Sequence, residues 1–173
     1  MFSHAFGKFM NFLKDVSGWC NHRPLLWWAL EATRGSSLPV LEMGCGEGST
    51  PYLRDYCQKN ERPFLSYDSD AGWAQRFGAA HVESWDGVVS GGYSVVLVDH
   101  APGERRHVDI ALLADRADYV VIHDSEPAAT GYMLDRIWSL FASRRNLVTG
   151  GAWASIVSQK PIPEIRIDGF RVE

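Results

Sequence analysis

The 173-residue sequence has few cysteines, no long apolar run and no extended basic run. Its three cysteines, Cys20, Cys45 and Cys57, are odd in number and lack the spacing of a zinc site, so they predict reduced thiols in a cytoplasmic protein. No stretch has the length to span a bilayer, and we expect no membrane partner. The net charge is −4 and the basic clusters are short, so no nucleic acid is expected as a partner. The length predicts one domain, 1–173.

Two common nucleotide-binding patterns are also missing. Residues 40–50 are typical of a buried strand that breaks into a glycine-rich turn, Gly44-Cys45-Gly46-Glu47-Gly48, before a helix capped by Ser49 or Thr50. Ser49 stands where a dinucleotide fingerprint has its third glycine, and no Gly-Lys-Ser/Thr follows as in a P-loop. Free N–H groups at a helix start favour a polar or anionic ligand group. The turn therefore predicts a nucleotide-type binding loop of another kind.

Apolar segments alternate with helical patterns along most of the chain. The predicted strands are 40–42, 64–68, 79–83, 93–100 and 119–124, with a terminal hairpin of 146–149 and 153–158. The predicted helices between them are 51–59, 70–77, 105–116 and 129–143. Together they predict an α/β fold: a mostly parallel seven-stranded sheet with helices on both faces and a C-terminal antiparallel hairpin.

The first 35 residues precede this pattern and are predicted to form N-terminal helices. Residues 2–20 have apolar side chains on one face at helical spacing. A second helix, capped by Asn21 or His22, stops near Gly35. The amphipathic first helix packs on the domain, covers the active site as a lid, or contacts a second subunit in a homodimer; the sequence leaves these open.

Four acidic residues, Glu42, Asp68, Asp99 and Asp124, stand at the ends of predicted strands. Parallel strands end at one edge of a sheet, where ligands of open α/β sheets bind. Four acids buried there without partners would be costly, so the set points to a site. Asp68 lies twenty residues after Gly48, the position at which an acid takes ribose hydroxyls. Its other interpretation is a helix cap, for which Asp70 is the better candidate.

An acidic residue followed by G-x-G-x-G resembles motif I of the class I S-adenosylmethionine (SAM) dependent methyltransferases, which have a Rossmann-like fold. The resemblance implies that Glu42 and the turn 44–48 hold the methionine part of SAM. It also implies that the segment Ser84-Trp85-Asp86 brackets the adenine. Trp85 as a core side chain is the other interpretation. The cofactor-binding set expected from this resemblance is Glu42, Gly44, Cys45, Gly46, Gly48, Ser49, Asp68, Ser69, Ser84, Trp85 and Asp99.

The segments Val96-Leu97-Val98-Asp99-His100 and Val121-Ile122-His123-Asp124-Ser125 resemble the metal-dependent small-molecule O-methyltransferases of the catechol O-methyltransferase type. In that family one strand ends in Leu-Asp-His and the next in Asp-Asn. The resemblance implies that Asp99 and Asp124 hold a magnesium ion that binds substrate hydroxyls. Such a hard cation prefers oxygen ligands and lowers the pKa of a bound hydroxyl.

The sequence departs from that family at two positions. Ser125 replaces the third ligand, and Pro102 stands at the position of the lysine base, so the base would be His100, His123 or a residue of 104–106. Asp99, His100 and Asp124 are the catalytic candidates. Methyl transfer also proceeds without a metal, because it needs mainly alignment and removal of a proton.

The acceptor class follows from absent motifs. Asp99 is followed by His100-Ala101-Pro102, not by the Pro-Pro-Tyr of amino-methylating DNA enzymes, and no Pro-Cys nucleophile pair is present. The predicted function is therefore methyl transfer from SAM to a hydroxyl of a small molecule or sugar. Two other functions stay open: a SAM-fold enzyme that cleaves SAM or transfers another group, and a non-catalytic SAM-binding subunit.

Overall fold

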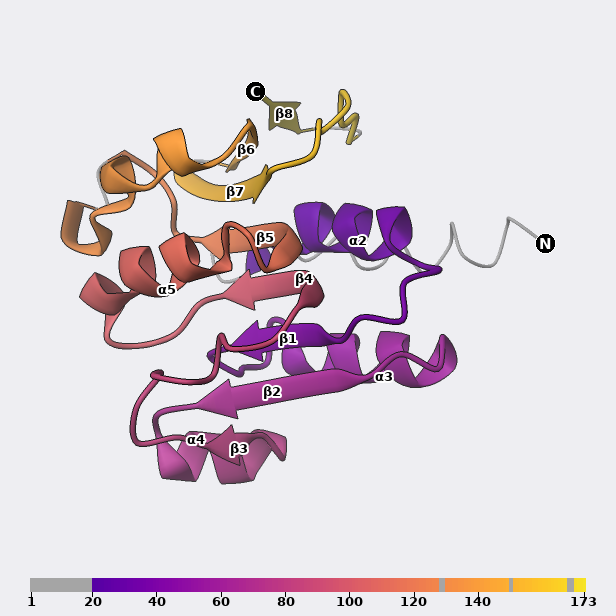
Figure 1. Cartoon of the computed structure of the whole chain (residues 1–173), viewed down its shortest axis with the longest axis vertical. Coiled ribbons are helices and arrows are strands. Elements are labelled where there is room, and N and C mark those ends of the chain that lie inside the picture. Colours follow the sequence, from indigo (N-terminus) through magenta and orange to yellow (C-terminus); the bar gives the residue numbers. More distant parts are fainter. Residues whose placement is uncertain (1–19, 128–129, 150, 168–169) are drawn as a thin grey trace.

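The computed structural model describes residues 20–127, 130–149, 151–167 and 170–173. The amphipathic helix expected at 2–20 lies outside this part of the chain. One sheet of eight strands runs through the molecule in the order β3-β2-β1-β4-β5-β7-β6-β8 (Figure 1). The strands are β1 Val40–Met43, β2 Phe64–Asp68, β3 Ala80–His81, β4 Tyr93–Val98, β5 Ala117–His123, β6 Ser143–Thr149, β7 Ala152–Ser158 and β8 Arg171–Val172.

The predicted α/β class and sheet are confirmed. The pairs from β3 through β5 are parallel, whereas β7 and β6 are antiparallel and form the predicted hairpin. The predicted third strand shortens to Ala80–His81. The eighth strand was not expected: Val172 pairs with Leu147 at the edge of β6. Strand β4 is buried along its whole length, as expected for a parallel strand covered on both faces.

Helices cover the two faces of the sheet, which has a separate apolar core on each side. Side chains such as Val95 and Leu97 pack with α2 (Arg23–Ala32) and α3 (Thr50–Lys59) on one face. The alternate side chains Val96 and Val98 pack with Ile110 of α5 (Arg106–Leu113) on the other. This alternation follows from the two-residue period of a strand. The fourth helix, α4 (Ala71–Phe77), packs beside β2 and β3.

The predicted continuous helix at 129–143 is wrong. Residues 130–140 form three short 3-10 turns, η3 (Thr130–Tyr132), η4 (Leu134–Arg136) and η5 (Trp138–Leu140), and β6 begins at Ser143. Met133 has φ 53°, a left-handed conformation that interrupts a helix. Leu134 and Ile137 are buried, and their spacing of three residues suits a 3-10 turn. The left-handed Met133 thus divides the predicted helix into short turns.

Two further predictions concern the cysteines and membrane-spanning segments. Cys20, Cys45 and Cys57 are buried free thiols, as predicted. No helix among the described residues combines the length and apolarity needed to cross a membrane.

Candidate functional site

The carboxyl ends of β1, β2, β4 and β5 point to the same edge of the sheet and carry the predicted acids (Figure 1). The glycine turn after β1 lies against the end of β4. Gly44 has φ +91°, and a Cβ at this position would lie 2.5 Å from the Asp99 carbonyl oxygen. Only glycine fits both the conformation and the space. The turn and the β4 acid therefore belong to one site.

Glu42 is fully buried and hydrogen-bonded to three hydroxyl groups. Ser49 and Ser66 donate over 2.5 Å and Thr50 over 3.1 Å. Burial raises the pKa of the carboxyl to about 7, although the hydroxyl hydrogen bonds oppose this rise. Thr50 also accepts from the backbone N–H of Gly46. Glu42 thus fixes the turn to the start of α3, and its contact with SAM stays a prediction.

Asp68 holds the other side of the turn. Its carboxylate accepts from the backbone N–H groups of Cys45 over 2.9 Å and Asp70 over 2.8 Å. The Asp70 side chain accepts from the Trp73 backbone N–H and caps α4, which confirms the predicted cap. Asp68 is therefore more than a cap, because it links the turn to β2. Its contact with ribose stays a prediction.

Two side chains that the sequence did not single out contact the turn. Arg23, at the start of α2, donates from Nε to the Gly48 carbonyl oxygen over 2.6 Å. Trp73 donates its indole N–H to the Cys45 carbonyl oxygen, although the residue is 39% exposed. The turn is thus held from α2 and from α4 by long side chains. Their distance in sequence from the turn explains why its pattern gave no sign of them.

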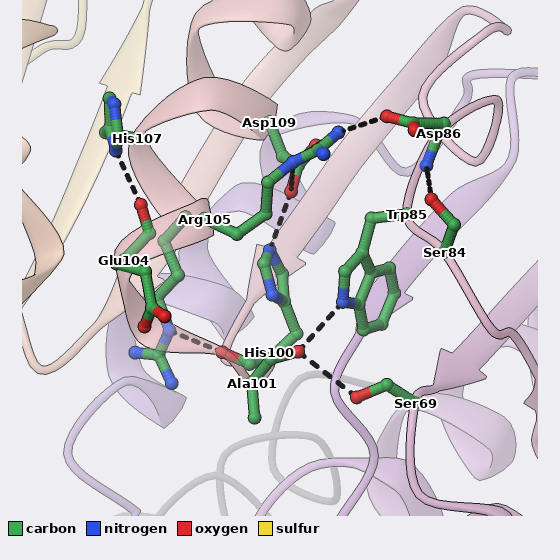
Figure 2. Close-up of polar contacts among 11 residues, drawn as sticks. Ser69, Ser84, Trp85, Asp86, His100, Ala101, Glu104, Arg105, His107 and Asp109 are labelled. Atoms are coloured by element: carbon green, nitrogen blue, oxygen red, sulfur yellow. Dashed lines mark hydrogen bonds and ion pairs between the residues drawn. The ribbon is translucent and has the colours of Figure 1, made fainter.

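Figure 2 shows the segment after β4, where Trp85 and Ser69 meet the backbone. The Ala101 carbonyl oxygen accepts from the Trp85 indole over 2.8 Å and from the Ser69 hydroxyl over 3.1 Å. Trp85 is 4% exposed and packs in the apolar core. Trp85 therefore lies as a core side chain, the second of its two interpretations. Ser84 is exposed and accepts a backbone hydrogen bond from Asp86.

His100 points into the body of the protein. Its ring lies 4.4 Å from the Trp85 ring, and Nε2 lies 3.2 Å from the Asp109 carboxylate (Figure 2). The side chains of His100 and Asp109 are both fully buried. Arg105 extends this network from Asp109 to the exposed Asp86. Placed in this way, His100 has no surface through which to reach a substrate.

The predicted acids Asp99 and Asp124 do come together, around His123. The His123 Nδ1 atom lies 3.2 Å from Asp99 Oδ1 and 3.1 Å from Asp124 Oδ2. Burial lowers the pKa of His123, but the hydrogen bonds to both carboxylates outweigh this effect and raise it to about 10. Arg106 Nη2 lies 2.9 Å from Asp99 Oδ1. Two cations thus compensate two carboxylates in this cluster.

Asp99 and Asp124 differ within the cluster. Burial would raise the pKa of Asp99, but hydrogen bonding to His123 and the charges of His123 and Arg106 hold it below its ordinary value. Asp124 keeps 32% of its side chain exposed and has φ 53°. A left-handed aspartate at a strand end is uncommon, and such strained residues gather at functional sites. The side chain of Asp99 is similarly exposed, at 30%, but it is also paired with Arg106.

The start of α2 contributes two polar residues that the sequence suggested only as caps. The His22 ring meets the His123 ring edge to face at 4.9 Å. Burial and the neighbouring His123 lower the pKa of His22 to about 3, so its ring is neutral. Asn21 and His22 are buried, and their side-chain nitrogen and oxygen atoms have no hydrogen-bond partner among the described residues. Buried polar groups without partners are costly, so Asn21 and His22 are candidates for contact with a bound molecule.

The donor set fits magnesium poorly. Single ligand atoms of Asp99, His123 and Asp124 lie within 4.8 Å of one another. Magnesium prefers oxygen ligands, whereas imidazole suits zinc and other transition metals. Arg106 and protonated His123 already compensate the carboxylates. No step of the chemistry is therefore assigned to the magnesium ion expected from the sequence.

Together, the strand order, the glycine turn after β1 and the acids at the strand ends define the fold of the class I SAM-dependent methyltransferases. The chain is similar to the delta-N METTL16 methyltransferase domain, with a TM-score of 0.54 and 12% identity over 79% of this chain and 81% of that one. It is also similar to the ribosomal protein L11 methylase of Lactobacillus delbrueckii subsp. bulgaricus, with a TM-score of 0.52 and 12% identity over 79% and 77% of the two chains. A third similar structure is the Podospora anserina methyltransferase PaMTH1 bound to S-adenosylhomocysteine (SAH), with a TM-score of 0.53 and 11% identity over 80% and 79%.

No protein-family model and no curated protein matches the sequence. At identities this low, the similarity establishes the fold. Of the three names, only that of the ribosomal protein L11 methylase states what the protein acts on, and the methyl acceptor of this chain stays open.

Proposed function

We propose that this protein binds SAM at the strand-end edge and transfers its methyl group to a hydroxyl of a small molecule or sugar. One observation carries the proposal: the glycine turn and the Asp99–His123–Asp124 cluster meet at Gly44, in a methyltransferase fold. In this arrangement the turn and Asp68 take the cofactor. The cluster then faces the methyl group and its acceptor.

The chemistry needs little besides alignment. The acceptor oxygen attacks the methyl carbon in line, the carbon–sulfur bond breaks, and the sulfonium becomes the neutral thioether of SAH. The hydroxyl proton passes to a base. Asp124 is the proposed base because its carboxylate is partly exposed, whereas His100 is fully buried. His123 and Arg106 are positioning residues that hold Asp99 and Asp124 at the edge.

Calorimetry with SAM and SAH, followed by mass spectrometry of products from a panel of hydroxylated acceptors, tests the proposal. Formation of SAH and a methylated hydroxyl supports it. Methylthioadenosine as product would instead indicate cleavage of SAM or transfer of another group. Binding of SAM without turnover of any acceptor would favour a non-catalytic subunit.

Variants assign the proposed roles. We expect Asp124→Asn to lower kcat by about a hundredfold, the lower range for loss of a general base, with SAM affinity unchanged. The matched control is Asp55→Asn, which removes an exposed carboxylate paired with Lys59 on α3. Full activity in Asp124→Asn would remove this residue from the mechanism.

A further inference from the structure

A cavity of about 480 Å³ lies where the segment after β5 meets the 3-10 turns and β6. Ser125, which directly follows Asp124, lines its wall. In Figure 1 the turns of this segment lie on the side toward which β1, β2 and β4 point. The volume falls in the range of small-molecule sites. The remaining lining residues are Glu126, Pro127, Met133, Leu134, Asp135, Arg136, Trp138 and Arg144.

Arg144 is the feature of this cavity that points to a ligand. Its Nε donates to the Asn146 side-chain oxygen over 2.7 Å, and its guanidinium carbon lies 3.6 Å from the centre of the Trp138 ring. Within the described residues its two terminal nitrogens have no hydrogen-bond or ion-pair partner. Burial lowers the pKa of the guanidinium because water is removed and no anion replaces it. A held, half-buried cation is thus left without a counterion.

The acids that line the cavity do not supply that counterion. Glu126 accepts from the Trp153 backbone N–H over 3.1 Å, and Asp135 is exposed. No ion pair joins either of them to Arg144 within the described part of the chain. Because burying a charge is costly unless it is paired, the partner of Arg144 is expected to come with a bound molecule.

A hydrogen-bonded chain fixes Arg144 relative to the proposed base. The Ser125 hydroxyl lies 2.7 Å from the Ser155 hydroxyl, and Ser155 donates to Asn146 over 2.8 Å. Asn146 in turn accepts from Arg144. The hydrogen bonds run from the segment directly after β5 to Ser155 of β7 and Asn146 of β6, and these three strands are paired in one sheet. The guanidinium is therefore held in place before a ligand arrives, which lowers the entropy cost of binding.

We propose that this cavity binds the methyl acceptor through an anionic group, a carboxylate or a phosphate, that pairs with Arg144. The acceptor is then a small hydroxylated acid whose apolar frame lies against Met133 and Leu134. This inference rests on the proposed function, because it places the acceptor hydroxyl at Asp124. A small molecule fits better than a nucleic acid, since the cation lines a bounded cavity in a chain of net charge −4.

Three probes that share one phenol test the anionic group: 4-hydroxybenzoate, 4-hydroxyphenyl phosphate and the neutral 4-hydroxybenzamide. Binding to the SAH-loaded full chain is measured by calorimetry, and methylation is measured with SAM. We expect one of the anions to bind about tenfold or more tightly than the amide, as for a hydrogen bond to a charged group. The benzoate and phosphate arms decide which anion is preferred.

Arg144→Gln should abolish the preference for the anion and leave binding of the amide unchanged. Arg144→Lys keeps the charge and should retain part of the preference, which separates recognition from a folding defect. Arg166→Gln is the control, because Arg166 is an exposed arginine paired with Glu164. Equal binding of acid and amide by the unaltered protein, or equal loss of both in Arg144→Gln, overturns the proposal.

The failures of the two proposals are distinguishable. If Arg144 selects the anion but SAM is never turned over, the cavity remains an anion site and methyl transfer is wrong. If phenols are methylated with no preference for the anions, methyl transfer stands and the anionic acceptor is wrong.

Discussion

Arg106 Nη2 lies 2.9 Å from Asp99 Oδ1, and the same guanidinium donates to the carbonyl oxygens of His100 and His123. One arginine at the start of α5 therefore joins the ends of β4 and β5. Its guanidinium carbon also lies 4.4 Å from the centre of the Tyr132 ring, which holds the 3-10 segment against the site. The acid cluster thus depends on a residue that belongs to neither strand.

This arrangement predicts strong coupling between Arg106 and Asp99. Arg106→Met should lower the free energy of unfolding by about 3 kcal/mol, because it leaves buried oxygens without their donor. The double variant with Asp99→Asn should lose clearly less than the sum of the two single variants. Urea denaturation measures all three, with the exposed Arg116→Met as control. Additive losses would show that the two side chains act independently.

Gly44 and Gly87 allow a matched test of the close approach at the turn. Both have a left-handed φ, +91° and +88°, but a Cβ on Gly87 would meet nothing within 4 Å. Gly87→Ala should therefore cost only the conformational penalty of about 1–2 kcal/mol. Gly44→Ala adds a clash with the Asp99 backbone and should cost more, with loss of SAM binding. Thermal unfolding and calorimetry compare the variants, and equal losses would argue against the contact.

Burial of Glu42 predicts a pH-dependent stability. Its folded pKa of about 7 lies above the ordinary value of 4.5, so folding favours the protonated form. The stabilisation from protonation is fully present below pH 4.5 and is lost as the pH rises through about 7. Its size is on the order of 3 kcal/mol at most. Relative to the unaltered protein, Glu42→Gln should gain stability between pH 5 and about 8, the range over which Glu42 ionises, in urea titrations.

A stability difference between Glu42→Gln and the unaltered protein that stays constant across this pH range would contradict the prediction. Asp55→Asn, an exposed carboxylate on α3, should show no such trend and serves as the control.

The composition of the acid cluster predicts that activity survives a chelator. Arg106 and protonated His123 already compensate Asp99 and Asp124, and the imidazole is a poor magnesium ligand. We expect EDTA followed by gel filtration to leave methyl transfer unchanged. Loss of activity that added magnesium alone restores would reinstate the metal site expected from the sequence.

The sequence predicted the sheet and the strand-end acids because both depend on local patterns. Val96, Leu97 and Val98 form a continuous apolar run, and such a run before Asp99 indicates a buried strand and its end. The sequence predicts a helix at 129–143 because the apolar residues of this segment have helical spacing. In the structure the left-handed Met133 interrupts that pattern, and three 3-10 turns form instead.

The residues of the candidate site divide in the same way. The sequence by itself determined that a glycine turn and four acids stand at strand ends. A strand's apolar run and the polar or glycine residues that end it are local features of consecutive residues. Only the tertiary structure decided that His100 turns inward to Asp109 while His123 lies between Asp99 and Asp124. It alone brought Arg106 and His22 to this edge and placed Arg144 over Trp138. The physical reason is that side-chain direction depends on partners from distant segments, and those partners meet only when the chain is folded.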